Sequence, residues 1–363
     1  MSVSQNQASY TWRLNPSYIQ NIQNRKFKND YIMKEELGKG GFGTVMRCVT
    51  KDGKKELAAK INNSPDKKAS MKMEADFSRD LSFDANNPNV KPHMNLVNIF
   101  DSITEGDIVY NLYEMASGGD LMEAINEKEF FAAVDAAIAI KQILDGVHFM
   151  HERGILHRDL KPHNILVQGR DIQVYKVTDF GLCCKRHTDA QGQFIAKAHG
   201  NAGTPQYQPP ECHIPPKEYD TDFDIWSCGC ILYQMLAGYP PFFDSDAAKL
   251  QRSIIDIDFP YPSPEWENMA DAKDMIDKML APIENFAQVW HNSGNRVYPK
   301  ARYNRQTYAQ LITDKFYTDG AAQHIRTKPT ETTLEKYNAR CVAKKAILEA
   351  YWAANPPPPP PAP

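Results

Sequence analysis

The sequence has no long apolar run and no surplus of charge of either sign, and both absences narrow the range of functions. No stretch of roughly 18 apolar residues occurs, and the N-terminal segment MSVSQNQASYTWRLNPSY has no apolar core, so neither a membrane span nor a secretion signal is expected. Lysine and arginine total 42 against 45 aspartate and glutamate residues, for a net charge of −3. Without a basic field, we expect no binding to nucleic acid or to a membrane.

Cysteine is scarce and shows no metal-binding pattern. The 7 cysteines are scattered without a CxxC pair, which argues against both a zinc site and a disulfide framework. This usage is typical of a reducing compartment, so we expect an intracellular, cytoplasmic protein, with a nuclear location not excluded. At 363 residues, 42% of them hydrophobic, the chain is long enough for one large domain or two modest ones.

The pattern of apolar residues changes along the chain and predicts two folded parts. Residues 1–28 are rich in Asn, Gln and Ser and are expected to form a flexible leader. From Tyr31, short strand-like runs separated by turn residues predict a small β-rich part, with one helical stretch at 68–81. From about Leu121, long helical windows such as 130–154 predict a larger helical part.

Three glycines, Gly38, Gly40 and Gly43, form a GxGxxG pattern between two strand-like runs. The pattern alone is weak, because dinucleotide-binding folds use the same spacing to open a helix and tight turns use glycine for its conformational freedom. Here the strand-like run TVMRCV follows. That context favours a β-hairpin whose backbone N–H groups close over phosphates.

Lys60 ends the apolar run that begins at Leu57. The simplest interpretation is an exposed lysine at the end of a strand. The functional interpretation is an ammonium group that meets phosphates and is held by a carboxylate from the following helix. We choose Glu74 as that carboxylate, with Asp76 and Glu56 as alternatives.

The most informative stretch is HRDLKPHNIL at 157–166, which is followed by DFG at 179–181. Two carboxylates and an amide in this order supply a proton acceptor for a hydroxyl group and two oxygen ligands for magnesium, as phosphoryl transfer requires. In these motifs the chain resembles the eukaryotic protein kinase family, serine/threonine type. The resemblance implies that ATP and Mg²⁺ are the cofactors and that Ser or Thr hydroxyls of protein substrates accept the phosphate.

The resemblance also implies roles for individual residues. Asp159 would deprotonate the attacking hydroxyl, Lys161 would neutralise charge on the moving phosphoryl group, and Thr204 belongs to a GTP element typical of serine/threonine kinases. Asn164 and Asp179 would hold Mg²⁺, and Lys60 would grip the phosphates. The glycines Gly38, Gly40 and Gly43 would approach the phosphates, and Glu74 would pair with Lys60. Glu114 and Met115 would form the hinge that binds adenine, with Tyr113 at the rear of the pocket. The apolar positions around adenine would be Leu37, Val45, Ala58 and Leu166, which could equally be ordinary core.

The fold implied by the resemblance is an α+β, bilobal protein kinase-like fold. Its β-rich N-lobe would span 31–116 and its helical C-lobe 117–318, with ATP·Mg²⁺ in the cleft between them. Glu211 and Arg305 would form a buried structural ion pair, and Asp224 would support the catalytic loop from beneath.

The sequence departs from the family pattern in the activation segment. Kinases switched on by phosphorylation there have a Ser or Thr a few residues before the GTP element, but IAKAHGNAG has neither, and Thr188 lies far upstream. Arg158, which pairs with that phosphate in relatives, is then left with water or an acidic residue such as Asp189 as its partner. We hypothesise that activity does not require phosphorylation of this segment.

Other positions near the motifs also differ or stay open. His163 stands where kinases directed to basic substrates have a glutamate, which weakens a preference for basic substrates, although Asp120 retains part of it. Cys183 and Cys184 follow the DFG motif. We interpret them as ordinary buried thiols, with redox sensing as the alternative.

The C-terminal part predicts contacts outside the catalytic domain. A helical extension is expected at 319–355, with the apolar stripe Leu334, Tyr337, Cys341, Leu348 and Trp352. The prolines Pro356–Pro361 begin an extended tail at 356–363, which suits an SH3, WW or profilin-like partner or serves only for solubility.

A pseudokinase scaffold is the alternative to an active kinase. It would use the fold and the proline tail to bring partners together. Because Lys60, Asp159, Asn164 and Asp179 are all present, the sequence favours an active enzyme.

Overall fold

The computed structural model of the chain describes residues 25–41, 43–62, 64–82, 92–169, 173–188, 194–196, 198–200, 202–262, 266–283, 305–314 and 316. The chain falls into two compact units. The first contains residues up to Ser117 together with Thr178–Gly181, and the second contains Gly118–Val177 and the residues from Leu182 onward. Only residues 25–28 of the expected leader are described, and the expected extension at 319–355 and tail at 356–363 lie outside the described residues.

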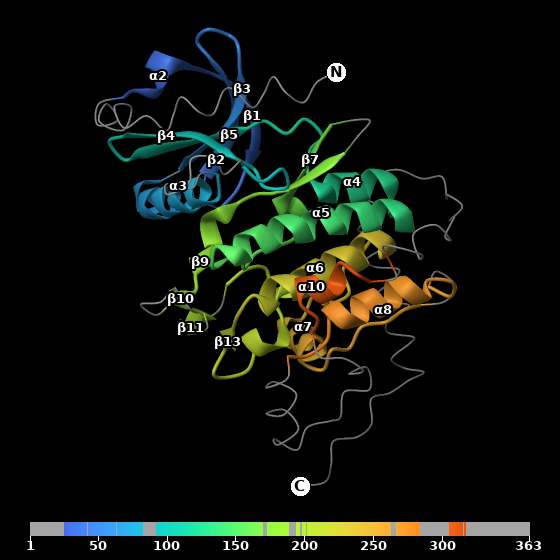
Figure 1. Ribbon diagram of the computed structural model, residues 1–363. Helices are drawn as coiled ribbons and strands as arrows, with labels where there is room; N and C mark the ends of the chain where they lie inside the picture. Colours follow the sequence, from blue (N-terminus) through green and yellow to red (C-terminus); the bar gives the residue numbers. More distant parts are fainter. Residues whose placement is uncertain are drawn as a thin grey trace. The chain divides into compact units, whose positions relative to one another are not determined.

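The first unit is built on one five-stranded antiparallel sheet (Figure 1). Its strands, in the order β1-β2-β3-β5-β4 across the sheet, are β1 (Tyr31–Lys39), β2 (Gly43–Thr50), β3 (Glu56–Asn62), β5 (Ile108–Glu114) and β4 (Ile99–Glu105). The short helix α2 (Phe27–Asp30) precedes β1. A 3-10 turn at Pro65–Lys67 leads from β3 into helix α3 (Lys68–Ser82).

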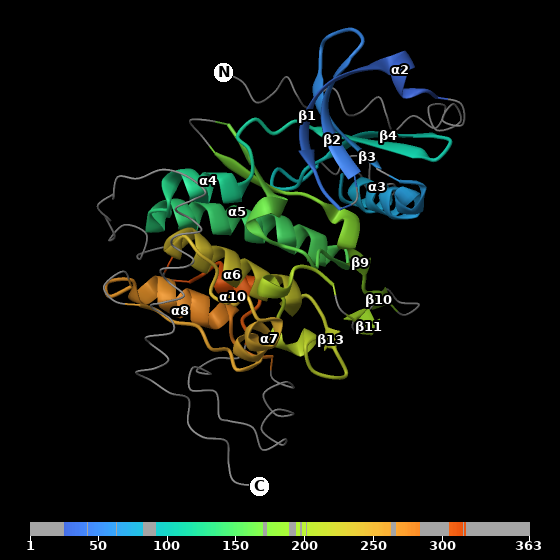
Figure 2. The same ribbon diagram turned by 180° about the vertical axis from the view of Figure 1, so that it is seen from behind.

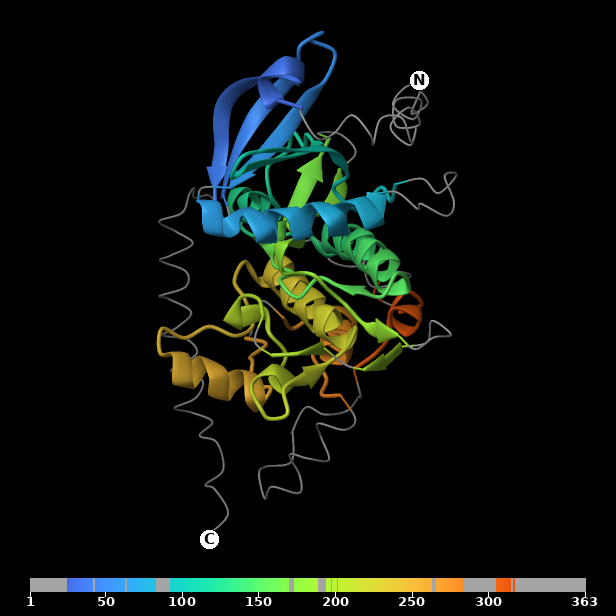
Figure 3. The same ribbon diagram turned by 90° about the vertical axis from the view of Figure 1, so that its left-hand side faces the viewer.

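Alternation of side chains along β3 separates the two faces of this sheet. Leu57 and Ala59 belong to an apolar cluster on one face, together with Phe27, Tyr31, Cys48, Phe100, Ile103 and Leu112. Lys60 lies on the opposite face, because successive strand side chains point to opposite sides. Helix α3 packs on β4 and β5 (the long, lighter blue helix in Figure 3), so the face that carries Lys60 is the one that α3 covers.

The second unit consists mainly of helices. They are α4 (Leu121–Lys128), α5 (Ala133–Glu152), α6 (Asp222–Ala237), α7 (Ala247–Ile255), α8 (Ala270–Met279) and α10 (Tyr308–Leu311). Helix α6 packs on both α5 and α8 (Figure 2). It is buried on all sides from Phe223 to Ala237, as expected for a helix that is apolar around its whole circumference. None of the described helices is both long and apolar enough to cross a membrane.

Two glycines set the packing and the end of α6. A Cβ atom added at Gly229 would lie 2.8 Å from the Cβ of Met279 in α8, so glycine is what allows these helices to approach closely. Gly238 ends α6 in a left-handed conformation, with φ 83°, and its N–H donates to the carbonyl of Gln234. The helix is therefore fixed along its length and at its C-terminal end.

Short strand pairs connect the helices of the second unit. They are β6 (Ile155–Leu156) with β9 (Cys184–Lys185), β7 (Ile165–Gln168) with β8 (Val174–Val177), β10 (His187–Thr188) with β11 (Phe194–Ala196), and β12 (Ala198–His199) with β13 (Glu218–Tyr219). Short 3-10 turns lie at Pro162–Asn164, Phe180–Leu182, Pro205–Tyr207 and Pro210–Cys212. A β-rich unit followed along the chain by a helical one confirms the expected α+β class.

Candidate active site

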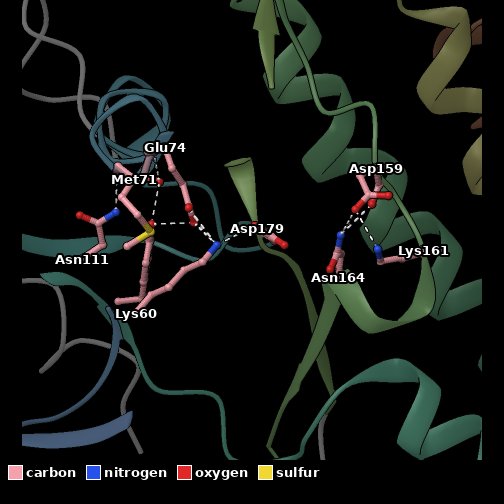
Figure 4. Close-up of polar contacts among 10 residues, drawn as sticks. Lys60, Met71, Glu74, Asn111, Asp159, Lys161, Asn164 and Asp179 are labelled. Atoms are coloured by element: carbon pink, nitrogen blue, oxygen red, sulfur yellow. Dashed lines mark hydrogen bonds and ion pairs between the residues drawn. The ribbon is translucent and has the colours of Figure 1, made fainter. Parts of the chain in front are cut away.

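Lys60 lies within β3 and meets two carboxylates of its own unit. Its Nζ donates to both Glu74 carboxylate oxygens at 2.8 Å and to Asp179 Oδ1, also at 2.8 Å (Figure 4). The alternatives, Glu56 and Asp76, form ion pairs with other residues. Glu74 is therefore the helix carboxylate that holds Lys60, and Lys60 is not an exposed lysine at the end of a strand.

Burial makes this cluster electrostatically strong. The Lys60 side chain is 12% exposed and that of Glu74 is 2% exposed. Burial disfavours the ammonium, but the charges of Glu74 and Asp179 outweigh it and raise the pKa of Lys60 to about 12. Burial raises the pKa of Glu74 despite the ammonium beside it. The two short contacts to Lys60 indicate that the pair is held as ammonium and carboxylate, because a buried charge is stable only when it is paired.

A second cluster, within the other unit, surrounds Asp159. Lys161 Nζ lies 2.8 Å from Asp159 Oδ2 and 2.8 Å from Thr204 Oγ1. Thr204 donates to Asp159 Oδ1 from both its N–H, at 2.9 Å, and its hydroxyl, at 2.8 Å. Asn164 Nδ2 donates to the carbonyl and to Oδ2 of Asp159. The three expected catalytic residues and one expected magnesium ligand thus form one hydrogen-bonded group. Figure 4 shows Asp159, Lys161 and Asn164 of this group.

The backbone of this catalytic loop is held from below by Asp224 of α6. The Asp224 carboxylate, fully buried, accepts the N–H groups of His157 and Arg158 at 2.9 Å each, and His151 Nε2 lies 2.8 Å from it. Burial would raise the pKa of Asp224, but the hydrogen bond and charge of His151 outweigh it and lower that pKa. Arg158 adopts φ 67°, a strained conformation that these contacts stabilise. The expected support from Asp224 is confirmed.

Gly203 and Gly43 occupy positions that only glycine fits. Gly203, directly before Thr204, has φ 87°, and an added Cβ would lie 2.1 Å from the carbonyl oxygen of Arg158. An added Cβ at Gly43 would lie 2.0 Å from the carbonyl oxygen of Ile61 on β3. An added Cβ would have no neighbour within 4 Å at Gly38, and at Gly40 it would lie 4.0 Å from the carbonyl oxygen of Gly43, without crowding. Packing within the protein therefore does not require glycine at these two positions. Because glycine has no side chain, a ligand could approach the backbone there.

The two residues expected to hold magnesium, Asn164 and Asp179, both carry oxygen donors. Within the second unit, Asn164 uses its amide nitrogen to hold Asp159, which leaves its amide oxygen for a cation. Within the first unit, Asp179 Oδ1 accepts from Lys60. Hard oxygen ligands suit Mg²⁺, which takes further ligands from water and phosphate. No group of three or more His, Cys, Asp or Glu side chains placed to hold a metal occurs among the described residues, and a site completed by phosphate oxygens does not need one. Asp179 belongs to the first unit and Asn164 to the second.

The residues expected to surround adenine all lie on strands, three of them in the first unit and Leu166 in the second. Val45 and Ala58 are half-buried on β2 and β3, Leu37 is exposed on β1, and Leu166 is half-buried on β7. At the expected hinge, Glu114 ends β5, and its N–H donates to the carbonyl of Asn98. Backbone hydrogen bonds to an adenine would therefore come from other groups of this segment, which continues with the half-buried Met115.

Cys183 and Cys184 have the environment of ordinary thiols. Cys183 is 2% exposed. Burial raises the pKa of the Cys184 thiol, and the nearby charge of Arg158 offsets this only in part. Because the thiolate is the reactive form, this environment favours the interpretation as buried thiols over redox sensing.

Two contacts of the site were not expected from the sequence. The Tyr113 hydroxyl donates to Glu74, and the Arg158 guanidinium donates to the Tyr219 hydroxyl. No sequence motif contains both a tyrosine and its partner. The polar end of Tyr113, in a strand that is largely buried, was the available signal for the first contact, since a buried tyrosine hydroxyl usually finds a partner.

Comparison with known proteins gives a family match over most of this region. The sequence matches the protein kinase domain over residues 31–285. It is 37% identical over 327 residues to the calcium/calmodulin-dependent protein kinase type II alpha chain of Drosophila melanogaster, covering 89% of this chain and 56% of that protein. It is 38% identical over 326 residues to the calcium/calmodulin-dependent protein kinase type II of Caenorhabditis elegans, covering 89% and 41%. For the subunit delta of Oryctolagus cuniculus, identity is 35% over 325 residues, covering 89% and 56%. The chain thus spans about half the length of these relatives.

Proposed function

We propose that this chain, which belongs to the protein kinase domain family, transfers the γ-phosphate of ATP to Ser or Thr hydroxyls of protein substrates in a Mg²⁺-dependent reaction. The observation that carries the proposal is the group of hydrogen bonds around Asp159. A carboxylate that accepts from Lys161, Asn164 and Thr204 is held in one orientation, as a group that must receive a hydroxyl proton requires.

Each polar residue of the two clusters has a role in this reaction. Asp159 orients the substrate hydroxyl and accepts its proton, and Lys161 stabilises charge on the phosphoryl group as it moves. Lys60, fixed by Glu74, binds phosphate oxygens. Asn164 and Asp179 would hold Mg²⁺. The ion neutralises charge on the phosphates, while the side chains of this chain position the reactants.

The nucleotide-binding residues complete the proposal. Gly38, Gly40 and Gly43 would let backbone N–H groups approach the phosphates, and the apolar side chains would enclose the adenine: Leu37, Val45, Ala58 and Leu166. The backbone carbonyl of Glu114 and the backbone of Met115 would supply hydrogen bonds to the adenine edge, since the N–H of Glu114 already donates to Asn98. The uncrowded Cβ positions at Gly38 and Gly40 support this assignment.

The choice of Ser and Thr is supported by Thr204. Its hydroxyl contacts both Asp159 and Lys161. A small polar side chain therefore lies beside the group that would receive the substrate's hydroxyl proton. His163 is exposed beside this group, whereas the Asp120 carboxylate accepts the N–H of Glu123 as the N-cap of α4. We therefore expect only a weak preference for basic residues in the substrate.

The test is transfer of labelled phosphate. The full chain is incubated with γ-labelled ATP, Mg²⁺ and a Ser/Thr peptide library, beside an Asp159→Asn control. We expect label on Ser or Thr with the wild type, and a decrease of at least about 10²-fold in the control. Nucleotide binding without any transfer above the control would support a pseudokinase scaffold instead.

The relatives' names state a dependence on calcium and calmodulin, and we propose a similar dependence here. The support is the apolar stripe in 332–354, which is interspersed with Lys336, Arg340, Lys344 and Lys345, because a basic amphipathic helix suits the groove of calmodulin. Binding of calcium-loaded calmodulin to the full chain is compared with a truncation after Asp319. Equal binding, turnover and melting temperature in the two proteins would exclude the proposal.

A partner for the proline tail and an intracellular location are the remaining proposals. Pro356–Pro361 would adopt an extended helix that SH3, WW or profilin-like domains bind at low entropic cost. Titration of such domains with the full chain and with an alanine replacement of these prolines tests it. Unchanged affinity in the replaced protein would leave the tail with a solubilising role only.

A further inference from the structure

Helix α3 is held on its sheet by buried polar groups as well as by apolar packing. Met71, Glu74, Ser78 and Ser82 follow one another at spacings of three or four residues, so they share one face of the helix. Glu74, Ser78 and Ser82 are 2%, 0% and 1% exposed. Polar groups in such surroundings are stable only when they have hydrogen-bond partners, so their contacts define one position of the helix.

Tyr113 of β5 makes the contact that is nearest to Lys60. Its hydroxyl donates to Glu74 Oε1 over 3.1 Å, the same oxygen that accepts from Lys60 Nζ at 2.8 Å. Ser78 Oγ donates to the carbonyl of Glu74 over 2.7 Å and lies 3.4 Å from the Tyr113 oxygen. Burial, and then the charge of Glu74, raises the pKa of Tyr113 well above its usual value. The hydroxyl therefore keeps its proton and remains a donor.

Strand pairing places this donor beside the lysine. In the β3·β5 pair, Tyr113 lies opposite Ala58 and Asn111 lies opposite Lys60. Asn111, which is fully buried, donates to the carbonyl of Met71 over 2.8 Å, about one turn before Glu74 (Figure 4). Two side chains of one strand thus fix two successive turns of α3.

At the far end of the helix, a strand backbone group makes a third contact. The N–H of Ile99, the first residue of β4, donates to Ser82 Oγ over 3.2 Å. The helix is therefore tied to the sheet at its start, middle and end by groups of the first unit.

We propose that Tyr113 is a positioning residue: its hydroxyl fixes the Glu74 carboxylate, and with it α3, in the place where Glu74 holds Lys60. The consequence for catalysis rests on the proposed kinase function, whereas the contact itself lies within the first unit. A side chain of the same size without the hydroxyl would fill the space but remove a donor from a buried carboxylate. That loss is larger than for an exposed one, because water cannot replace the donor.

The test uses Tyr113→Phe in the full chain, with Tyr110→Phe as the matched control. Tyr110 lies on the same strand but on the other face, where its ring stacks on Phe27 at 4.6 Å between centroids. A third variant, Tyr113→Leu, removes the ring as well as the hydroxyl. Three quantities are compared: hydrogen–deuterium exchange over Lys68–Ser82, kcat, and the KM for a peptide substrate.

We expect Tyr113→Phe to lower kcat about tenfold, since hydrogen bonds to charged groups are the stronger ones. The KM for the peptide should stay within about twofold, because Tyr113 affects the positioning of phosphate-binding groups and not peptide binding. Exchange should become faster over α3 and stay unchanged over Ala133–Glu152 of α5. Tyr110→Phe should match the wild type in all three measurements.

One pattern of results would overturn the proposal. If Tyr113→Phe matches the wild type in kcat and in α3 exchange while Tyr113→Leu does not, only the bulk of the ring matters. Failure of the kinase function itself is distinguishable. In that case the wild type transfers no more phosphate than Asp159→Asn, while exchange over α3 still shows whether the Tyr113 hydroxyl positions the helix.

Discussion

Arg158 donates a hydrogen bond from Nη1 to the hydroxyl of Tyr219 over 3.1 Å, and its Nε donates to the carbonyl of Leu182 over 2.8 Å. Tyr219 lies in β13, which pairs with β12 of the activation segment. A neutral hydroxyl thus contacts the arginine for which the sequence suggested water or Asp189, a residue outside the described ones. Nearby, Arg186 forms an ion pair with Asp220, so both ends of β13 connect to the activation segment.

This arrangement predicts activity without phosphorylation of the activation segment. Phosphatase-treated protein and Thr188→Ala should retain the turnover of untreated wild type, because the Arg158 guanidinium already contacts Tyr219 and Leu182. Tyr219→Phe should lower kcat by about three- to tenfold, since it removes an acceptor from a partly buried charge. Steady-state assays after quantitative dephosphorylation check this. A large loss on dephosphorylation would refute the hypothesis.

The ion pair between Lys60 and Glu74 predicts that replacing Lys60 lowers kcat more than replacing Glu74. Lys60→Met should lower kcat by about 10²–10³-fold, because it removes the positive charge that meets the phosphates. Glu74→Gln should cost about tenfold, since the amide oxygen still accepts from Lys60 but the countercharge is lost. Lys72→Met, at an exposed lysine of α3, is the matched control and should be silent. Equal effects of Lys60→Met and Lys72→Met would contradict the assigned role.

His213 predicts a stability change in acid. Burial, and then the charge of Lys217, lowers the pKa of His213 from its usual 6.5 to about 4, and its buried Nε2 has no hydrogen-bond partner among the described residues. The unfolded chain therefore binds this proton at a higher pH than the folded one. The contribution to stability is fully present above about pH 6.5 and is lost as the pH falls toward 4.

Melting temperatures measured between pH 7 and 4 check this expectation. His213→Gln should show a shallower decline than the wild type over that window. The exposed His163 supplies a control, since His163→Gln should decline in parallel with the wild type. If the melting temperatures of wild type and His213→Gln fall equally with decreasing pH, another group causes the loss of stability in acid.

The family resemblance implied that Lys161, Asn164 and Thr204 act together with Asp159, but the sequence did not decide which carboxylate holds Lys60. Lys161 and Asn164 lie two and five residues from Asp159 in one short loop, whereas Thr204 reaches Asp159 from 45 positions along the chain. Three carboxylates were in reach of Lys60 by sequence. The outcome depends on the rotation of α3 on the sheet, which local sequence does not fix. It also depends on the arginines that pair with Glu56 and Asp76, of which only Arg79, three residues after Asp76, is a local partner.

The two tyrosine contacts were unpredictable for a related reason. Tyr113 reaches Glu74 because the register of β3 and β5 sets its height on the sheet, and Tyr219 reaches Arg158 from 61 positions along the chain. Strand register and long-range pairing depend on the whole packed unit. Periodicity can assign a tyrosine to a strand, whereas the partner of its hydroxyl requires coordinates.

The buried ion pair between Glu211 and Arg305, expected from the sequence, is present and predicts a large stability effect. Arg305 Nη1 and Nη2 donate to the two carboxylate oxygens of Glu211 at 2.5 and 3.0 Å, and the side chains are 0% and 4% exposed. Arg305 Nε also donates to the carbonyl of Ala281, and the guanidinium lies over the ring of Trp226. This arginine, beyond the matched residues 31–285, thus ties its segment to the core of the second unit.

Breaking the pair should cost more than replacing it. Arg305→Met leaves the Glu211 carboxylate buried without its partner, which should lower the free energy of unfolding by about 3–5 kcal/mol. The double variant Glu211→Leu with Arg305→Met removes both charges and should recover a substantial part of that loss, because no unpaired charge remains. Denaturant titration of the three proteins measures the difference. If the single variant unfolds within about 1 kcal/mol of the wild type, solvent reaches the carboxylate and the pair is not a structural element.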